Sequence, residues 1–177
     1  MTKEGVDRAI NIIDSTDINN DKILVVYIPD IHESLAGIVA GRVKEQYNKP
    51  TIILTKSEEG VKGSARSIEE YNMFEGLLAC KELLDKFGGH PMAAGLSLQE
   101  DKVDELRIAL NNKCELTDED LTRKIMIDSS LPLEYLNLHL IEELNVLEPF
   151  GKGNSKPVFG VRDAKITKAM LLGKDKN

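Results

Sequence analysis

The spacing of apolar side chains predicts a helix at the start of the chain, followed by a strand, a helix and a second strand. Apolar residues recur at i, i+3, i+4 and i+7 over residues 3–15, the period of one helical face. Continuous apolar runs predict buried strands over residues 22–28 and 51–55. Between them we expect a helix over residues 34–48, with Ser34 as its cap. Strand, helix and strand with short connections are typical of a right-handed parallel crossover, so we expect an α/β fold with a parallel or mixed sheet flanked by helices.

The same two periods, 3.6 and 2, continue more weakly to the end of the chain. The elements that they predict are an extended stretch at 61–67, a helix at 73–86, a strand at 93–98, a helix at 101–112, a strand at 121–128, a helix at 136–147 and a β segment at 158–166.

Composition restricts the class of protein. With 177 residues and 41% hydrophobic content, the chain can form a packed globule. Its formal net charge of −7 opposes long-range attraction to phosphate, so any contact with nucleic acid must be local. The absence of Trp and an aromatic content of 5% argue against an extensive base-stacking platform. No apolar run is long enough for a membrane helix and no signal segment is evident, so we expect a cytoplasmic protein with no membrane partner and two free thiols, Cys80 and Cys114.

Two adjacent glycines, Gly88 and Gly89, precede His90 in a stretch that is rich in small residues. One interpretation is a loop that presents His90 at a cleft, where the imidazole contacts a phosphate oxygen or orients a metal-bound water. The other is a pair of glycines that ends the preceding helix. The local pattern leaves both open.

A second candidate site combines a guanidinium with small hydroxyl side chains. Arg66 lies between Ser64 and Ser67, and Gly63 precedes them. Arg binds phosphate in bidentate fashion, and hydroxyl and glycine N–H groups can complete such a site. The alternative is a surface arginine beside a turn.

Three blocks of sequence, in one order, resemble a known family. Residues 63–98 resemble the DHH-associated domain of RecJ, the single-strand-specific exonucleases of the DHH phosphoesterase superfamily. Residues 32–42 look like the helix-opening motif of the same domain, and residues 147–154 are similar to the entry into the family's oligonucleotide-binding barrel. The resemblance implies a linker helix from a missing catalytic domain at 1–20, a DHH-associated domain at 21–115, and a connecting strand and helix with a truncated barrel at 116–177.

The resemblance also implies roles for particular residues. His90 would be catalytic and would contact phosphate near the scissile bond. The residues implied to bind substrate phosphate are Gly63, Ser64, Arg66, Ser67, Gly88 and Gly89. His32 and Arg42 are secondary candidates, for which helix capping and a salt bridge are the competing interpretations. No residue of this chain is expected to bind metal, since Mn²⁺ or Mg²⁺ would be held by the DHH domain.

These implications together describe the substrate-binding part of a 5′-to-3′ single-stranded-DNA exonuclease in DNA repair and recombination. Its partners would be single-stranded DNA and the DHH catalytic domain of the same protein, and the chain alone would be inactive. Residues 31–34 read Ile-His-Glu-Ser, where many RecJ proteins have Trp-His-Gln-Gly. Two alternatives remain: a DHH phosphodiesterase for short oligoribonucleotides or cyclic dinucleotides, and a non-catalytic nucleic-acid-binding module.

Overall fold

The computed structural model of the chain describes residues 2–58, 60–151 and 153–170. The chain divides into two compact units, Met1–Arg123 and Lys124–Asn177, and each is described by itself. The predicted domain bounds at residues 20 and 115 stay a prediction.

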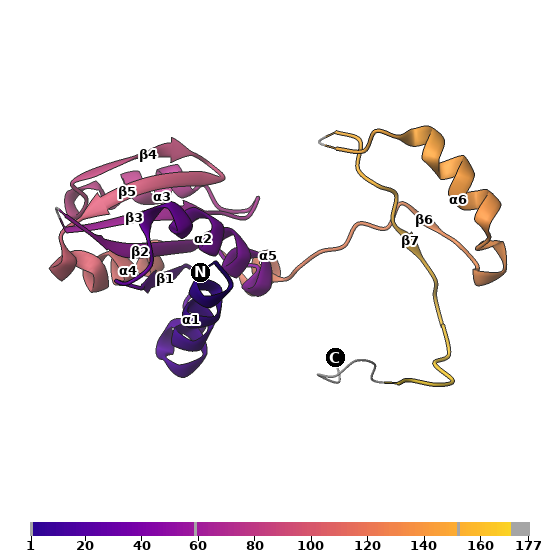
Figure 1. The fold of residues 1–177 in the computed structure, drawn as a ribbon, viewed down its shortest axis with the longest axis horizontal. Coiled ribbons are helices and arrows are strands. Elements are labelled where there is room, and N and C mark those ends of the chain that lie inside the picture. Colours follow the sequence, from indigo (N-terminus) through magenta and orange to yellow (C-terminus); the bar gives the residue numbers. More distant parts are fainter. Residues whose placement is uncertain (1, 59, 152, 171–177) are drawn as a thin grey trace. The chain divides into compact units, whose positions relative to one another are not determined.

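The first unit is built on a mixed five-stranded sheet of order β1-β2-β3-β5-β4 (Figure 1). Its strands are β1 (Leu24–Tyr27), β2 (Thr51–Ser57), β3 (Gly60–Arg66), β4 (Lys86–His90) and β5 (Ala93–Leu98). Strands β1 and β2 pair in parallel, and every later pair is antiparallel. The sheet and its flanking helices confirm the predicted α/β class.

Helices cover both faces of this sheet. The helices of the first unit are α1 (Thr2–Ser15), α2 (Glu33–Tyr47), α3 (Met73–Leu78), α4 (Val103–Asn112) and α5 (Asp118–Leu121), with short 3₁₀ helices η1 (Asp17–Asn20), η2 (Lys81–Leu83) and η3 (Glu100–Lys102). Helices α1 and α2 pack on one face, where Val26 and Ile53 are buried with Val39. Helices α3 and α4 pack on the other face, where Leu54 is buried with Leu106. Successive residues of β1 and β2 enter different clusters, which explains their continuous apolar runs.

The start of the chain belongs to this packed unit. Ala9 and Ile13 of α1 are fully buried in the same cluster as Ala40 of α2. Tyr47 at the end of α2 donates a hydrogen bond to Asp14 Oδ1 at 2.7 Å. The predicted amphipathic helix is therefore confirmed, while its predicted role as a linker stays a prediction.

The helix predicted over 73–86 is confirmed at its start but is too long, because α3 ends at Leu78 and the chain reaches β4 through η2. The predicted Gly-Gly-His loop is likewise wrong, since Gly88, Gly89 and His90 pair with β5 as an edge strand. Local preference gives way here to a hairpin with β5, the next strand along the chain, which is itself paired with β3.

The strand predicted over 121–128 is also wrong. Residues 118–121 form α5, which Thr117 and Asp120 cap reciprocally, and residues 123–128 form no helix or strand. The two cysteines are free as predicted, with Cys80 buried and Cys114 half-buried.

The second unit contains little regular structure among its described residues. It consists of β6 (Ser129–Ser130), η4 (Leu133–Tyr135), α6 (Leu138–Leu144), η5 (Asn145–Leu147) and β7 (Phe159–Gly160). Strands β6 and β7 pair in parallel. The predicted helix over 136–147 is confirmed in its central part by α6, whereas the β segment predicted over 158–166 is limited to Phe159–Gly160. In the described part of the chain, no helix is long and apolar enough to cross a membrane.

Candidate functional site

The alternation of residues along β3 creates a polar face. Val61 and Ala65 are buried in the core that α3 and α4 cover, so Lys62, Ser64 and Arg66 point to the opposite face. Their partners across the antiparallel pairs share that face, because directly opposed residues lie on the same side of a sheet.

The register of β3, β5 and β4 arranges this face into three rows. Each row takes one residue from each strand, in the order β3, β5, β4. The rows are Arg66–Ala93–His90, Ser64–Gly95–Gly88 and Lys62–Ser97–Lys86. Basic residues or histidine thus flank a middle row of small residues, and we refer to this arrangement as the three-row face.

Helix α2 covers only part of the three-row face. It packs on β2 and β3, and its first residues border an open groove of about 760 Å³. The residues that line the groove include Glu33, Gly37, Lys62, Ser64, Arg66, Lys86 and Gly88. The groove is therefore walled by the first half of α2 and floored by β3, β5 and β4.

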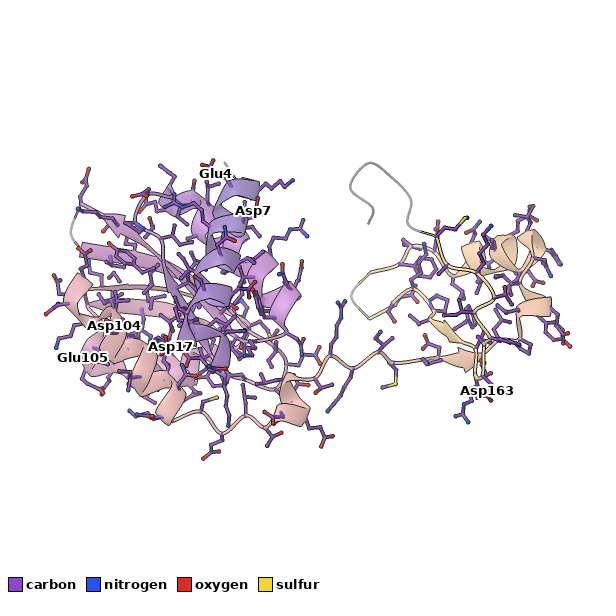
Figure 2. All side chains as sticks on the ribbon, turned by 90° about the horizontal axis from the view of Figure 1, so that it is seen from below. Glu4, Asp7, Asp17, Asp104, Glu105 and Asp163 are labelled. Atoms are coloured by element: carbon purple, nitrogen blue, oxygen red, sulfur yellow. The ribbon has the colours of Figure 1, made fainter. Side chains whose placement is uncertain are left out.

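Many carboxylates that make the chain acidic belong to elements that do not line this groove. Figure 2 labels Glu4 and Asp7 on α1 and Asp104 and Glu105 on α4. The side chains that line the groove include the basic residues Lys62, Arg66 and Lys86. A locally basic groove is thus compatible with the net charge of −7.

The guanidinium of Arg66 is held in place by its own strand and by α2. Its Nη1 donates to Ser64 Oγ at 3.1 Å and to the Ala65 carbonyl at 2.8 Å. A Cβ on Gly37 would lie 2.8 Å from Nη2, so glycine at this position lets the guanidinium rest against α2. Within the described residues both hydrogen bonds use Nη1, which leaves Nη2 to donate to an anion in the groove.

His90 lies in the same row as Arg66, two strands away, which corresponds to about 10 Å between their Cα atoms. It is exposed, and its Nδ1 accepts a hydrogen bond from Met92 N at 3.2 Å. An accepting Nδ1 places the proton of the neutral ring on Nε2, so Nε2 can donate to a ligand. His90 does not itself line the groove, but it extends the row that ends at Arg66.

The turn after His90 is anchored to its surroundings. The Pro91 carbonyl accepts from Met73 N at 3.0 Å, and the Met92 carbonyl accepts from Ser67 N at 2.9 Å. Ser67 is buried, and its hydroxyl donates to the Tyr71 carbonyl at 2.7 Å. The Ser67 hydroxyl is thus bonded inside the fold rather than in the groove.

The three glycines predicted to bind phosphate differ in their surroundings. A Cβ on Gly63 would overlap the Leu54 side chain and lie 2.8 Å from the Ile53 carbonyl oxygen, so this glycine permits close packing. A Cβ on Gly89, whose φ is 154°, would overlap the Ala93 carbonyl oxygen. Gly88 faces the groove and has no atom within 4 Å of an added Cβ, so it leaves the floor open.

The secondary candidates lie outside the groove. His32 caps α2 through its Nδ1, which accepts from Ser34 N at 3.2 Å; the predicted capping by Ser34 is therefore wrong, and His32 fixes the helix start. Arg42 is exposed and pairs with Glu45 Oε2 at 3.2 Å. Both residues thus make the structural contacts, a helix cap and a salt bridge, that were the alternatives to a binding role.

Some residues that line the groove were not predicted as site residues from the sequence, among them Gly37, Lys62, Lys86 and Ser97. Lys62 could have been found from the alternation in residues 61–67 once that stretch was taken as a strand. Lys86 and Ser97 become neighbours through the pairing of β4 with β5, and the two glycines of β4 hide that strand from the sequence pattern.

The donor set of the groove does not fit a divalent metal. Its cationic side chains would repel one, and Glu33, the carboxylate among its lining residues, pairs with Lys62 Nζ at 3.3 Å. Among the residues that the structure describes, no group of three or more His, Cys, Asp or Glu side chains could hold a metal ion. The groove can therefore hold an anion through nitrogen donors.

Comparison with protein families supports the resemblance inferred from the three sequence blocks. The DHHA1 domain matches residues 20–116, and the RecJ OB domain matches residues 127–177.

Similar proteins include RecJ exonucleases from several bacteria. The single-stranded-DNA-specific exonuclease RecJ of Bacillus subtilis (strain 168) is 36% identical over 99% of this chain and 23% of its own length. RecJ of Haemophilus influenzae is 35% identical over 87% of this chain and 28% of its own length. The crystal structure of RecJ from Thermus thermophilus in complex with Mn²⁺ superposes with a TM-score of 0.77 at 25% identity, over 90% of this chain and 24% of that chain.

The chain spans about a quarter of the length of the curated relatives it matches. Within that span, the matching sequences and the shared fold cover the three sequence blocks that resemble RecJ. The chain therefore belongs to the DHHA1 domain family, in the form that RecJ proteins carry.

Proposed function

We propose that this chain is the substrate-binding part of a RecJ-like enzyme that hydrolyses single-stranded DNA from its 5′ end, in DNA repair and recombination in the cytoplasm. The observation that carries the proposal is the three-row face, which gathers Lys62, Ser64, Arg66 and Lys86 in one groove and extends the Arg66 row to His90. Such a face supplies fixed nitrogen donors to a phosphate backbone.

The residues predicted from the sequence have defined parts in this proposal. Arg66, held by Ser64, binds a phosphate through Nη2, and a 5′-terminal phosphate with its extra charge is the preferred ligand. His90 donates from Nε2 to a phosphate oxygen and stabilises the negative charge that develops there during hydrolysis. Gly88 keeps the floor open, while Gly63, Ser67 and Gly89 act indirectly by fixing the packing and the turn.

The metal chemistry belongs to another part of the protein in this proposal. RecJ from Thermus thermophilus has been solved with Mn²⁺ and with Mg²⁺. A DHH domain of the same protein, outside these 177 residues, would hold such ions and supply the activated water. The residues of this chain bind and orient the strand, and we expect no cleavage by the chain alone.

The match of the RecJ OB domain to residues 127–177 supports DNA over short oligoribonucleotides or cyclic dinucleotides as the substrate, since the curated relatives are single-stranded-DNA-specific. A non-catalytic binding module would use the same groove. It differs from the exonuclease only in lacking a catalytic domain elsewhere.

The experiment that tests the proposal measures binding of the chain to fluorescein-labelled oligodeoxythymidylate by fluorescence anisotropy, with a 5′-phosphate or a 5′-hydroxyl. Arg66→Ala removes a charge-assisted contact worth about 1.5–3 kcal/mol, so we expect affinity for the 5′-phosphorylated strand to fall by more than about tenfold. Affinity for the 5′-hydroxyl strand falls less, because the terminal phosphate is the preferred ligand of Arg66.

Arg42→Ala is the matched control, since it removes the same charge from an exposed position on α2 that does not line the groove. It should change either affinity by less than about twofold. An Arg66→Ala variant that folds normally but binds both strands as the parent chain does would contradict the proposal.

A further inference from the structure

The row Lys62–Ser97–Lys86 forms a second basic edge of the three-row face. It lies four residues along the strands from the row of Arg66 and His90, or about 13 Å between Cα positions. The row Ser64–Gly95–Gly88 separates the two edges. The groove therefore has two basic edges and a floor of small residues between them.

The cationic groups of β3 are held at different levels of α2. The Arg66 guanidinium rests against Gly37, and Lys62 Nζ lies 3.3 Å from Glu33 Oε2. Glu33 and Gly37 are four residues apart, so they lie about 6 Å apart along the helix axis. The two cations thus contact successive turns of α2, Lys62 at Glu33 and Arg66 at Gly37.

The floor between them lets a chain approach the backbone of the sheet. An added Cβ on Gly88 would meet nothing within 4 Å, and one on Gly95 would meet only the Gly63 carbonyl oxygen at 4.0 Å. A sugar-phosphate backbone can therefore pass from one basic edge to the other without displacing a side chain from these two positions.

The ion pair between Glu33 and Lys62 is open to exchange. The two side chains are 53% and 54% exposed, and exposed pairs of this kind contribute little to stability. Glu33 is also the carboxylate among the residues that line the groove. A phosphate that reached Lys62 would therefore compete with Glu33 for the same ammonium group.

We propose that Lys62 and Lys86 form a second phosphate subsite, and that Glu33 is an internal counter-ion which the phosphate displaces from Lys62. The proposal rests on the proposed function, in which Arg66 holds the first phosphate. Because each phosphate entering the second subsite replaces an existing ion pair, the net gain in binding free energy at this edge is smaller than at Arg66. The DNA strand is therefore held at two points, and the second point releases it more readily.

The first test compares ligands with one phosphate and with three, using thymidine 5′-monophosphate and the 5′-phosphorylated trinucleotide pdT3 in NMR titrations of the chain. Lys86→Ala should weaken pdT3 binding about three- to tenfold and lower the slope of log affinity against log salt by about 0.7. Binding of the monophosphate should not change. Lys81→Ala, an exposed lysine on η2 outside the groove, is the matched control and should alter neither.

The second test removes the counter-ion. Glu33→Gln should tighten pdT3 binding about two- to fivefold, the range expected when an exposed ion pair no longer competes. Glu45→Gln is the matched control, because Glu45 makes a similar exposed pair with Arg42 on the same helix. It should leave pdT3 affinity unchanged.

The outcomes separate this proposal from the proposed function. Loss of monophosphate binding in Arg66→Ala supports the first phosphate site whatever the lysine variants do. A Lys86→Ala variant that loses affinity equally for both ligands, or for neither, contradicts a second subsite. A Glu33→Gln variant that binds pdT3 no more tightly than Glu45→Gln contradicts it as well. If Arg66→Ala binds the monophosphate normally, the proposed function itself fails.

Discussion

The two units of this chain differ in how they use their apolar side chains. The first unit buries them in two clusters, one on each face of the sheet, and many are completely inaccessible to solvent. In the described residues of the second unit, 124–151 and 153–170, no residue is buried. Met126 is 82% exposed and Leu138 is 79% exposed.

This difference shows where a rigid binding site can be built. A site that discriminates between ligands needs side chains whose positions are fixed by packing, and the three-row face stands on a sheet with a core on its far side. The described part of the second unit has backbone pairing and helix caps but no such core. We therefore propose that phosphate recognition belongs to the first unit.

The largest expected difference between the units is in the cost of truncating a leucine. Leu106 on α4 is fully buried, so Leu106→Ala should lower the free energy of unfolding by about 2–5 kcal/mol. Leu138→Ala, at an exposed position of α6, should change it by less than about 0.5 kcal/mol. Urea unfolding followed by circular dichroism measures both, and equal losses would contradict the contrast in packing.

A pair of glycine substitutions compares the core side of the sheet with the groove. Gly63→Ala adds a methyl group against Leu54 and the Ile53 carbonyl, so the free energy of unfolding should fall by about 1–3 kcal/mol. Gly88→Ala has free space around the methyl group and should change stability by less than about 0.5 kcal/mol, but it should weaken DNA binding by filling the groove floor. The reverse pattern in unfolding and binding measurements would contradict the assignment of the two faces.

The smallest expected effect concerns the contact between α1 and α2. Burial, and then the hydrogen bond to Asp14, raise the pKa of Tyr47 to about 12. In the unfolded chain this hydroxyl ionises near pH 10, so between pH 10 and 12 the unfolded state binds fewer protons and stability falls as the pH rises. Tyr47→Phe should show a shallower fall over this range in urea midpoints, and an identical fall in both proteins would contradict the role of Tyr47.

The elements of the first unit could be predicted from sequence where the pattern of apolar residues is unambiguous. The continuous apolar runs around Val25 and Ile53 and the helical period of α1 were sufficient for β1, β2 and α1. Strand β4 could not be predicted in this way, because Gly88 and Gly89 have low strand preference and extend only through pairing with β5.

Some residues of the candidate site could be predicted from the sequence, and others could be found only in the structure. Ser64 and Arg66 were found from their residue types, and their pattern on β3 places them side by side on one face. Lys86 and the shared row of Arg66 and His90 follow from the register of three strands, in which β5 lies between β3 and β4 and so departs from the order of the chain. Gly37 enters the site only because α2 packs beside Arg66.

The most direct test of the central claim is a ¹H–¹⁵N NMR titration of the full chain with 5′-phosphorylated oligodeoxythymidylate. We predict that the largest chemical-shift changes fall on residues 62–66, 86–90 and 93–97 of the three-row face and on the first turns of α2. Largest changes confined to residues 124–170, with the three-row face unaffected, would contradict the claim that the first unit holds the phosphate backbone.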